Sequence, residues 1–392
     1  MSFDLRAIQQ ALREEGLDGW LFFDHHERDP LAYRVLGFRP PRTPTRRWYY
    51  LVRAEGEPAG LAHRIEAEML DALPGEKRLY ASWEEQTHKL AGLLAGCKRV
   101  AMQYSPRCAV PYVAMVDAGT VELVREAGVE VCSSANLVQY FEARWTRRQL
   151  ETHLEAGRRV DAIRRAAFEE TGRRLRGGVA VNEWDIKRFI LEAFEREGME
   201  TDHGPIVAVN ENAANPHYEP TADVHREIRP GDWLLIDLWA KLREPDAVYY
   251  DITWTGYCGT AVPGAIQKVF DIVLEARDAA VNKVQAAVAA GRALHGYEVD
   301  DAAREVIRGH GYGERFIHRT GHSIGREVHG AGANMDNLET HDERRVIPWT
   351  GFSIEPGIYL EEFGVRSEVN MFVGDPEAMV TGEIQRRPVT IG

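Results

Sequence analysis

Short apolar and aromatic runs alternate with amphipathic stretches over the first third of the chain. The strand-like runs, rich in β-branched and aromatic side chains, are residues 20–24, 46–54, 77–81, 98–104 and 128–132. Residues 83–96 instead place apolar side chains at helical spacing. Strands interleaved with helices are typical of an α/β layer. The pattern therefore predicts an N-terminal α/β domain of roughly 140 residues, within the usual size range.

The pattern changes at Thr146, where a long, charged amphipathic helix begins and continues to Leu175. We place the domain boundary here, which gives one domain of residues 1–145 and another of residues 146–392. Further helices are predicted over residues 182–198 and 263–291, and a shorter one after the Asp300–Asp301 pair. Strands are predicted over residues 206–209, 233–238, 249–255, 352–355 and 365–373. Because these elements lack the Gly-rich strand-to-helix turn of a nucleotide-binding unit, we expect the second domain to be mixed α+β.

The composition removes several classes of function. The chain has 392 residues with 48 Lys and Arg against 61 Asp and Glu, and its net charge of -13 would repel a nucleic-acid backbone. No apolar run approaches the length of a membrane span and the N-terminal segment lacks the features of a signal peptide, so we expect a cytoplasmic protein without a membrane partner. The cysteines have no C-x-x-C spacing, which excludes a zinc ribbon and a dithiol redox motif.

Two aspartates interrupt strongly apolar strands. Asp237 ends the run WLLID, and Asp251 lies between two tyrosines and the run ITWT. A carboxylate is costly to bury in such a place unless a positive charge meets it. The segment KLREPDA between the two runs is turn-like, so two antiparallel strands could bring both carboxylates together. Each aspartate taken alone is equally consistent with a strand-end residue that accepts backbone hydrogen bonds.

Two glutamates and a histidine-rich segment extend this pattern. Glu355 follows the apolar run FSI, and Glu368 stands inside GVRSEVNMFV. The segment IHRTGHSIGREVHG holds His318, His322 and His329, and its glycines indicate a strand or tight loop rather than a metal-binding helix. Any one histidine could be structural, but three so close together favour ligands. A shared pair of cations would compensate all the strand-embedded carboxylates at once.

Taken together, these motifs resemble those of the M24 metallopeptidases, the group of methionine aminopeptidase, aminopeptidase P and prolidase with the pita-bread fold. The motifs occur in the family's order: Asp237, Asp251 with the following Ile-Thr, Gly321-His322, the SIEPGIY around Glu355, and the R-x-E of Arg366 and Glu368. The resemblance covers residues 145–390. It implies an α+β chain whose C-terminal pita-bread domain follows a smaller creatinase-like α/β domain, as in the creatinase, prolidase and aminopeptidase P branch.

The resemblance implies two divalent cations held by Asp237, Asp251, His322, Glu355 and Glu368. Asp237 would bind one ion, His322 and Glu355 the other, and Asp251 and Glu368 would bridge both. Such an oxygen-rich set with one imidazole suits Mn²⁺, our first expectation, and also Co²⁺, Zn²⁺ or Fe²⁺. Two ions about 3.5–4 Å apart would hold a bridging hydroxide and polarise the scissile carbonyl. Glu355 would carry the proton to the leaving nitrogen.

Further residues take their expected roles from the same resemblance. His217, in the stretch IVAVNENAANPHYEP, would face the substrate. With His318 and His329 it would donate hydrogen bonds around the carbonyl oxygen and the prolyl end of the substrate. Alternatively, these three histidines would not contact the substrate but would hold the metal-binding carboxylates in position. Arg366 would orient Glu368 or another carboxylate by a bidentate pair.

The chain departs from the family pattern around the expected substrate pocket. Trp239 stands after the first aspartate where glycine is common, and Trp254 stands where arginine is frequent. Ser323 replaces a glycine after the metal histidine, and Gly330 replaces an acidic residue after the last histidine. These changes touch the pocket rather than the metal ligands, so they bear on proline specificity.

Three functions are the alternatives. The first is a peptidase that cleaves Xaa-Pro bonds in dipeptides or at the N-termini of longer peptides. The second is a creatinase-like hydrolase or lyase of a non-peptide small molecule, and the third is a non-catalytic binding protein. The complete ligand set favours the peptidase over the other two. Creatinase itself lacks the metal ligands, and a binding protein that no longer catalyses a reaction would be expected to lose some of them. The resemblance also implies a homodimer.

Overall fold

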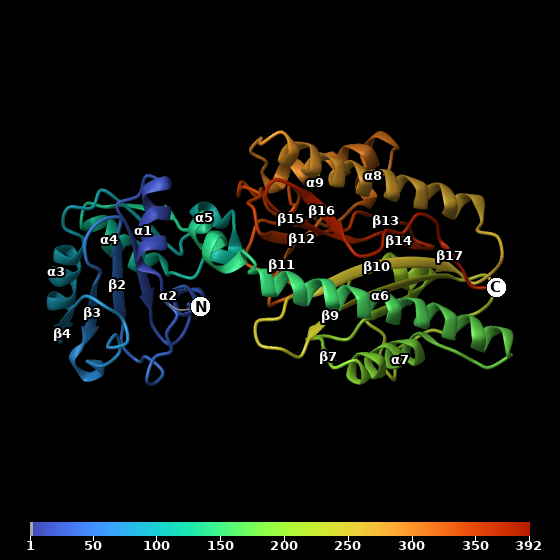
Figure 1. The fold of residues 1–392 in the computed structure, drawn as a ribbon, viewed down its shortest axis with the longest axis horizontal. Helices are drawn as coiled ribbons and strands as arrows, with labels where there is room; N and C mark the ends of the chain where they lie inside the picture. Colours follow the sequence, from blue (N-terminus) through green and yellow to red (C-terminus); the bar gives the residue numbers. More distant parts are fainter. Residues whose placement is uncertain (1–2) are drawn as a thin grey trace. The chain divides into compact units, whose positions relative to one another are not determined.

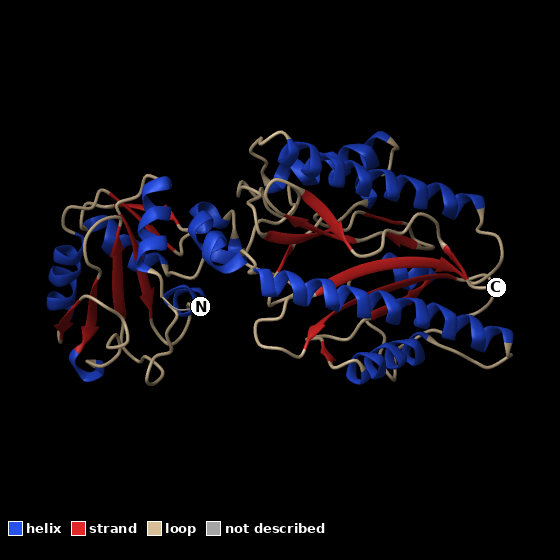
Figure 2. Ribbon diagram, in the orientation of Figure 1, coloured by secondary structure: helices blue, strands red, loops and turns tan. Residues whose placement is uncertain are grey.

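The computed structural model describes residues 3–392 and separates into two compact units, Met1–Glu142 and Ala143–Gly392. Each unit contains its own sheet structure and hydrophobic core (Figures 1 and 2). Among the described residues, no helix combines the length and the apolar character needed to cross a membrane.

The N-terminal unit is built on one mixed sheet with the strand order β4-β3-β2-β1-β5-β6. Its strands are β1 (Gly19–Asp24), β2 (Trp48–Arg53), β3 (Ala59–His63), β4 (Glu76–Tyr80), β5 (Arg99–Met102) and β6 (Glu130–Ser133). Its helices are α1 (Leu5–Glu14), α2 (Pro30–Leu36), α3 (Trp83–Leu94), α4 (Ala118–Glu126) and α5 (Ala135–Val138). All the strands and the helix predicted for this region are present. The small residues of β3 and the few turns of α2 and α4 gave too weak a pattern to be predicted.

The core of this unit lies between the sheet and helices α3 and α4. Leu21 and Leu51, on the paired strands β1 and β2, pack in one cluster with Leu90 and Val124 from the two helices. Side chains at alternate strand positions share a face, which explains why one set of strand residues builds this cluster.

The C-terminal unit combines long helices with several antiparallel strand pairs. Its helices are α6 (Arg147–Arg176), α7 (Glu183–Arg196), α8 (Gly264–Ala289) and α9 (Gly296–Gly309). Its strands are β7 (Met199–Glu200), β8 (Ile206–Val209), β9 (Trp233–Leu242), β10 (Tyr250–Tyr257), β11 (Ser323–Ile324), β12 (Thr350–Ile354), β13 (Gly357–Tyr359), β14 (Gly364–Arg366), β15 (Val369–Val373), β16 (Ala378–Thr381) and β17 (Val389–Thr390). One sheet has the order β17-β10-β9-β7 with β8 on β9, a second has the order β11-β12-β15-β16, and β13 pairs with β14.

Helices cover both outer sides of the C-terminal unit. Figure 1 shows α6 and α7 beside β9 and β10, and α8 and α9 on the opposite side of the strands. Val160 and Ala167 of α6 pack in one cluster with Ile236 of β9, whereas Val273 of α8 packs with Met371 of β15 in another. The strands between these layers are therefore shielded from water, which makes any carboxylate on them expensive.

Sequence signals set the starts of the long helices. Thr146 caps α6 and Asn182 caps α7, each within a capping box, as their side-chain chemistry predicts. The prediction for α9 was wrong, since this helix begins at Gly296 rather than after the Asp300–Asp301 pair. His295 and Glu298 close a capping box at its start. Asp300 lies inside the helix because it pairs with Arg304 one turn later.

The strand predicted over residues 365–373 is interrupted. β14 pairs with β13, and β15 pairs with β12, so the two segments belong to different sheets. Between them the Ser367 N–H donates to the Pro356 carbonyl at 3.4 Å and the Glu368 N–H donates to the Thr253 carbonyl at 3.1 Å. These bonds turn the backbone toward β10. The Glu368 side chain therefore lies inside the unit.

The β9–β10 hairpin places both predicted aspartates on one face. In its antiparallel register Asp237 lies opposite Thr253, and Asp251 lies opposite Trp239. Side chains of directly paired residues share a face, as do residues two apart on one strand. These four side chains therefore share one face of the hairpin, while Trp254 lies on the other.

His153 of α6 is fully buried and is bonded at both ring nitrogens. Nδ1 lies 2.6 Å from the Tyr249 carbonyl oxygen, and Nε2 lies 2.7 Å from Thr381 Oγ1. Because a carbonyl oxygen only accepts, Nδ1 carries the proton and Nε2 accepts from the threonine. Burial lowers the pKa of His153 from 6.5 to about 4, although the Tyr249 carbonyl opposes part of the shift.

We expect acid to weaken the fold through His153. The unfolded chain protonates this histidine below about pH 6.5, whereas the folded chain does so only near pH 4. Its stabilising contribution is therefore complete above the unfolded pKa and decreases as the pH falls toward the folded one, by roughly 3 kcal/mol in full. The free energy of unfolding in urea should decrease less between pH 7.5 and pH 5 in a His153→Gln protein than in the wild type. The exposed His88→Gln change should keep the wild-type slope, and an unchanged slope in His153→Gln would contradict the assignment.

Candidate metal centre

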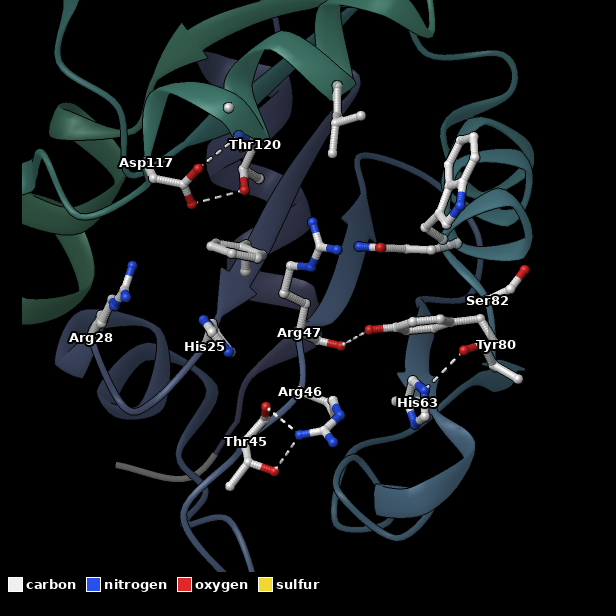
Figure 3. A pocket seen from close by; sticks show the side chains of 16 residues that line it. His25, Arg28, Thr45, Arg46, Arg47, His63, Tyr80, Ser82, Asp117 and Thr120 are labelled. Atoms are coloured by element: carbon white, nitrogen blue, oxygen red, sulfur yellow. Dashed lines mark hydrogen bonds between the residues drawn. The ribbon is translucent and has the colours of Figure 1, made fainter.

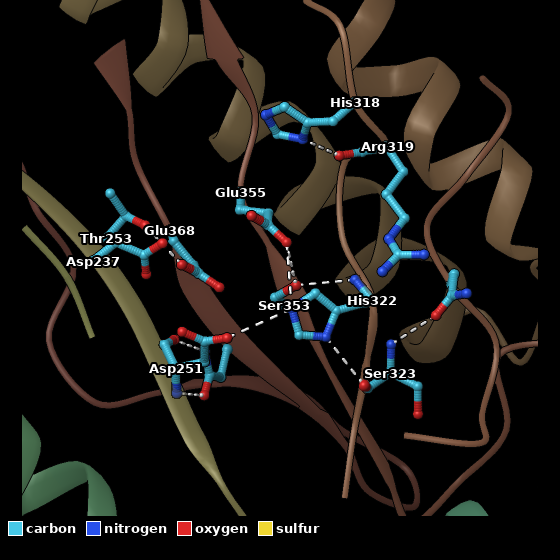
Figure 4. Close-up of polar contacts among 12 residues, drawn as sticks. Asp237, Asp251, Thr253, His318, Arg319, His322, Ser323, Ser353, Glu355 and Glu368 are labelled. Atoms are coloured by element: carbon cyan, nitrogen blue, oxygen red, sulfur yellow. Dashed lines mark hydrogen bonds and ion pairs between the residues drawn. The ribbon is translucent and has the colours of Figure 1, made fainter. Parts of the chain in front are cut away.

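Three buried side chains meet where β10, β15 and the loop before β11 come together. The ligand atoms of Asp251, His322 and Glu368 all lie within 4.8 Å of one another. Figure 4 shows these side chains together with Asp237 and Glu355 around a common space. All the residues expected to bind metal are thus gathered in one place, although they come from strands and loops far apart in the sequence.

The loop that carries His322 approaches β12 closely. A Cβ on Gly321 would lie 1.9 Å from the Ser353 carbonyl oxygen, so only glycine permits this approach. The His322 N–H also donates to Ser353 Oγ at 2.9 Å. Gly321 and Ser353 together fix the position of the histidine backbone.

The tautomer of His322 follows from its neighbours. Nδ1 lies 3.2 Å from the Ser323 carbonyl oxygen, and because that oxygen only accepts, Nδ1 carries the proton. Nε2 therefore faces Asp251 Oδ2 at 3.5 Å and Glu355 Oε1 at 3.4 Å. Burial disfavours the charged ring, but these carboxylates outweigh it and raise the pKa of His322, so a cation bound there would displace the proton that they favour on Nε2. A backbone carbonyl that fixes the distant ring nitrogen in this way is typical of histidines that bind metal.

Arg366 ties two of the carboxylates to the hairpin. Its Nη2 donates to Asp237 Oδ2, and its Nε donates to Thr253 Oγ1 at 3.0 Å. The same threonine hydroxyl donates to Glu368 Oε2 at 2.9 Å. Arg366 thus orients Asp237 directly and Glu368 through Thr253, with one donor to the carboxylate rather than the expected bidentate pair.

Three carboxylate oxygens at this site are buried without a bonding partner among the described residues. They are Asp237 Oδ1, Asp251 Oδ1 and Glu368 Oε1. Burial, reinforced by the neighbouring carboxylates, raises the pKa of Asp251 to about 7 and that of Glu368 well above its usual value. Burial also raises the pKa of Asp237, although the positive charge of Arg366 reduces this increase. Orphaned oxygens beside an imidazole lone pair are a donor set that suits divalent transition-metal ions, so the residues present fit the expected cation pair.

Glu355 remains the more acidic carboxyl of the site. Burial raises its pKa, but the positive fields of His322 and Arg366 outweigh that effect and leave it below the usual value. Ser353 Oγ donates to Glu355 Oε1 at 3.1 Å. Glu355 is therefore held as a carboxylate at the edge of the cluster, with one oxygen oriented by a hydroxyl.

His318 is engaged in a hydrogen-bonded chain that ends at Asp237. Its Nδ1 lies 2.7 Å from the Arg319 carbonyl oxygen and must donate, so Nε2 accepts from the Tyr359 hydroxyl at 2.7 Å. Tyr359 in turn accepts from Arg366 Nη1 at 3.1 Å. Burial lowers the pKa of His318 to about 4, so the ring is neutral. Both ring nitrogens are occupied, which favours the supporting role over direct contact with substrate.

The hydroxyl of Tyr359 is expected to stabilise this chain. A Tyr359→Phe change leaves Arg366 Nη1 and His318 Nε2 with an unmet partner in a buried place, which costs about 1–3 kcal/mol. The free energy of unfolding in urea should fall by that amount. The Tyr312→Phe change serves as control, because no bond to the Tyr312 hydroxyl is found among residues 3–392. Equal stability of the two variants would show that the chain contributes nothing.

The remaining expected histidines lie in different surroundings. His329 packs its ring against His322, with ring centroids 4.4 Å apart and planes at 72°. Burial, with the charge of His322, lowers the pKa of His329 to about 4, so it is neutral beside the cluster. His217 is exposed, its N–H donates to Asn215 Oδ1 at 3.1 Å, and its ring makes no hydrogen bond to the cluster within residues 3–392.

The two tryptophans also lie in different surroundings. Trp239, opposite Asp251 in the hairpin, lies on the cluster's face, and its indole N–H donates to Asp202 Oδ1 at 2.9 Å. Trp254 faces α6, where the guanidinium carbon of Arg164 lies 3.4 Å from its ring centroid. The structure therefore brings Trp239 to the site and places Trp254 on the far side of the strand.

Several residues that shape the site were not singled out from the sequence. Thr253, Ser353 and Tyr359 bridge charged groups through their hydroxyls. Asn370 accepts from the Asp251 N–H at 3.0 Å, and its amide donates to the Asp251 carbonyl. The two-residue spacing of Thr253 after Asp251 and of Ser353 before Glu355 is the signal that could have found two of them, because it puts them on the ligand face.

Comparisons with known proteins agree with this geometry. The model of metallopeptidase family M24 matches residues 151–375, which is more than half of the chain. The Xaa-Pro dipeptidase of Lactobacillus helveticus is 34% identical over 210 residues, covering 53% of this chain and 49% of that protein. The Xaa-Pro dipeptidase of Pyrococcus furiosus is 32% identical over 232 residues, covering 58% of this chain and 60% of that protein. The chain thus spans about half of the length of these curated relatives.

A solved structure matches the complete chain. Dipeptidase PepE from Mycobacterium ulcerans superposes with a TM-score of 0.71 at 23% identity and covers 100% of both chains. At this identity the likeness bears on the fold alone, and it confirms the predicted α+β architecture with a pita-bread unit. From the matched family model and the order and geometry of the carboxylates and His322, the chain belongs to metallopeptidase family M24.

Proposed function

We propose that the protein is a dinuclear metal-dependent peptidase that hydrolyses Xaa-Pro bonds in dipeptides or at peptide N-termini. The observation that carries the proposal is the set of open oxygens on Asp237, Asp251 and Glu368 beside Nε2 of His322. Buried acids with orphaned oxygens are unfavourable unless cations neutralise them. A metal-free binding protein would have no use for this arrangement.

The ligand assignment follows the family order. Asp237 would hold one ion, His322 and Glu355 would hold the other, and Asp251 and Glu368 would contribute to both. Bound cations would supply Lewis acidity for the scissile carbonyl and would make the attacking water more acidic. The donor set is rich in oxygen and has no thiolate, so we propose Mn²⁺, with Co²⁺, Zn²⁺ and Fe²⁺ as the alternatives.

The protein's own groups move the protons and orient the substrate. Glu355, held by Ser353, takes a proton from the attacking water and delivers it to the leaving nitrogen. His329, neutral and packed on His322, donates a hydrogen bond to the carbonyl oxygen of the substrate. Trp239 forms an apolar wall next to Asp251, which suits a compact substrate.

The preference for proline rests on the relatives. The two curated relatives are Xaa-Pro dipeptidases, and each is over 30% identical to the segment it matches. A proline ring is apolar, compact and fixed in its backbone angle, so it fits a small pocket with an indole wall. A homodimer and a cytoplasmic location are further proposals, which size-exclusion chromatography and cell fractionation can test.

A substrate panel tests the proposal. The Mn²⁺-loaded protein is assayed with Xaa-Pro dipeptides, an Xaa-Pro-Yaa tripeptide and matched Xaa-Ala peptides, beside protein stripped with a chelator. We expect cleavage of the proline substrates by the loaded protein alone, and the ratio of dipeptide to tripeptide cleavage distinguishes a dipeptidase from an aminopeptidase. Bound metal without cleavage of any peptide would overturn the proposal in favour of a small-molecule hydrolase.

A further inference from the structure

A cavity of about 620 Å³ lies in the N-terminal unit, at one end of its sheet. Its walls come from the ends of β1, β3 and β4, from the segment before β2, and from the first turns of α3 and α4. Figure 3 shows the Arg47 side chain in the middle of this space, with His25 and Arg28 on one side and His63 and Tyr80 on the other. The volume is within the usual range for a small-molecule site, roughly 300–1,000 Å³.

The lining of this cavity is strongly basic. Arg28, Arg46 and Arg47 contribute guanidinium groups. The one acidic lining residue is Asp117, and both of its carboxylate oxygens are bonded to Thr120, each at 2.9 Å. Three positive charges therefore face one negative charge among the residues that line this cavity, in a chain whose net charge is -13.

The arginine side chains are also short of partners. Neither the Arg28 nor the Arg47 side chain is in an ion pair within residues 3–392, and Arg47 interacts with the neutral hydroxyl of Tyr80. The Arg46 guanidinium donates to its neighbour Thr45, at 3.0 and 3.1 Å, and the Arg46 N–H donates to Glu66 Oε2 at 3.1 Å. Elsewhere on this protein exposed arginines pair with acids, as Arg78 does with Glu76. Guanidinium groups that converge and outnumber the neighbouring acids are a typical arrangement for binding phosphate or carboxylate.

The two histidines of the cavity differ in their surroundings. Burial lowers the pKa of His25, and the charges of His26, Arg28 and Arg47 lower it further. The Ile65 N–H donates to His63 Nδ1 at 3.1 Å, so His63 Nε2 carries the proton and donates to a backbone carbonyl. The charge offered to a ligand is therefore that of the three arginines.

Two helix N-termini open on the same space. Ser82 and Trp83 begin α3, and Gly119 and Thr120 lie in the first turn of α4. The positive ends of both helix dipoles reinforce the field of the arginines. The combination matches a phosphate group better than an isolated carboxylate, because phosphate has more oxygens to accept bonds from several directions.

One wall of the cavity is apolar and aromatic. Phe23, Tyr80 and Leu123 line it, and the Trp83 side chain is 70% exposed at its rim. An exposed indole beside guanidinium groups offers a surface on which a flat ring can stack. An inorganic anion would leave this wall unused.

We propose that the cavity binds a phosphorylated small molecule with an aromatic ring, of the nucleoside diphosphate class, with its phosphates on Arg28, Arg46 and Arg47 and its ring against Trp83. A ligand of about three negative charges balances the three arginines. All the residues involved belong to the N-terminal unit, so the binding is a property beyond the proposed peptidase function.

Isothermal titration calorimetry on the full-length, Mn²⁺-loaded protein tests this proposal, with ADP, pyrophosphate, inorganic phosphate and adenosine as probes. We expect ADP to bind with one site per chain, more tightly than pyrophosphate, and adenosine to give no measurable heat. An Arg47→Gln variant should bind ADP at least tenfold more weakly, and Arg28→Gln should show a similar loss. Arg6→Gln, on the exposed face of α1, is the matched control and should bind as the wild type does.

The outcomes are distinguishable. If the metal centre bound the phosphate groups, ADP would bind equally tightly to the wild type and to Arg47→Gln. That result would overturn the proposal. Pyrophosphate binding as tightly as ADP would remove the role of the aromatic wall. Thermal melting of the free proteins controls for folding: because Arg47 is in no ion pair among the described residues and lies among like charges, Arg47→Gln should melt close to the wild type. The absence of heat with every probe would likewise reject the site.

Discussion

The Glu355→Gln protein is expected to hydrolyse a Xaa-Pro dipeptide about 10²–10⁴-fold more slowly than the wild type in kcat/KM, the range associated with loss of a general acid–base group. Glutamine keeps the size of the side chain, and its carbonyl oxygen can still accept from Ser353 Oγ. It cannot, however, take a proton from water or return one to a leaving nitrogen. The loss should therefore appear chiefly in kcat rather than in KM.

Metal analysis must accompany this measurement, because Glu355 is also a proposed ligand. A variant that retains both ions and loses kcat assigns the proton transfer to Glu355, whereas one that loses an ion assigns the defect to binding. The matched control is Glu361→Gln, an exposed position a few residues further along the chain, which should keep wild-type activity. Wild-type kcat/KM in the Glu355→Gln protein would exclude it from the reaction.

The sequence was sufficient to predict the strands that carry the carboxylates. Asp237 and Asp251 interrupt apolar, β-branched runs, and the turn-like segment between them indicated two antiparallel strands. The observed pairing of β9 with β10 confirms that prediction. The glycines around His322 correctly indicated a strand or tight loop rather than a helix, but the close approach of Gly321 is to the Ser353 backbone oxygen of β12, which the sequence did not predict. The local sequence pattern was informative wherever a charged residue stood in a segment that was predicted to be buried.

The sequence was less informative about contacts that depend on which face of a strand a residue takes in the fold. Trp254 was grouped with the pocket from its place in a motif, but strand alternation turns it toward Arg164 on α6. His217 lies in a recognisable stretch, yet it is exposed in the structure. Tyr359 connects His318 to Arg366, and nothing local to its sequence indicates that link, because the partners come from separate loops and strands.

The metal ions are expected to be a major source of stability for the C-terminal unit. Ligand that binds only the folded state at 100–1,000 times its Kd contributes about 2.7–4.1 kcal/mol, which corresponds to roughly 5–15 °C in melting temperature for a domain of this size. The chelator-treated protein should therefore melt lower than the Mn²⁺-loaded protein by that interval. Identical melting temperatures would mean that the cluster binds no ion that matters to the fold.

An Asp251→Asn variant separates the two effects of the carboxylates, metal binding and mutual repulsion. Loss of a bridging ligand should abolish most of the Mn²⁺-induced rise in melting temperature, while exposed Asp223→Asn should leave it intact. In the metal-free state the order should reverse, because the asparagine removes a buried negative charge whose oxygen has no partner and which lies beside other acids. Metal-free Asp251→Asn should then melt at or above the metal-free wild type. That crossing would show that the cluster is retained for cation binding at the expense of the metal-free fold, whereas a variant less stable in both states would assign Asp251 a structural role through its contact with His322.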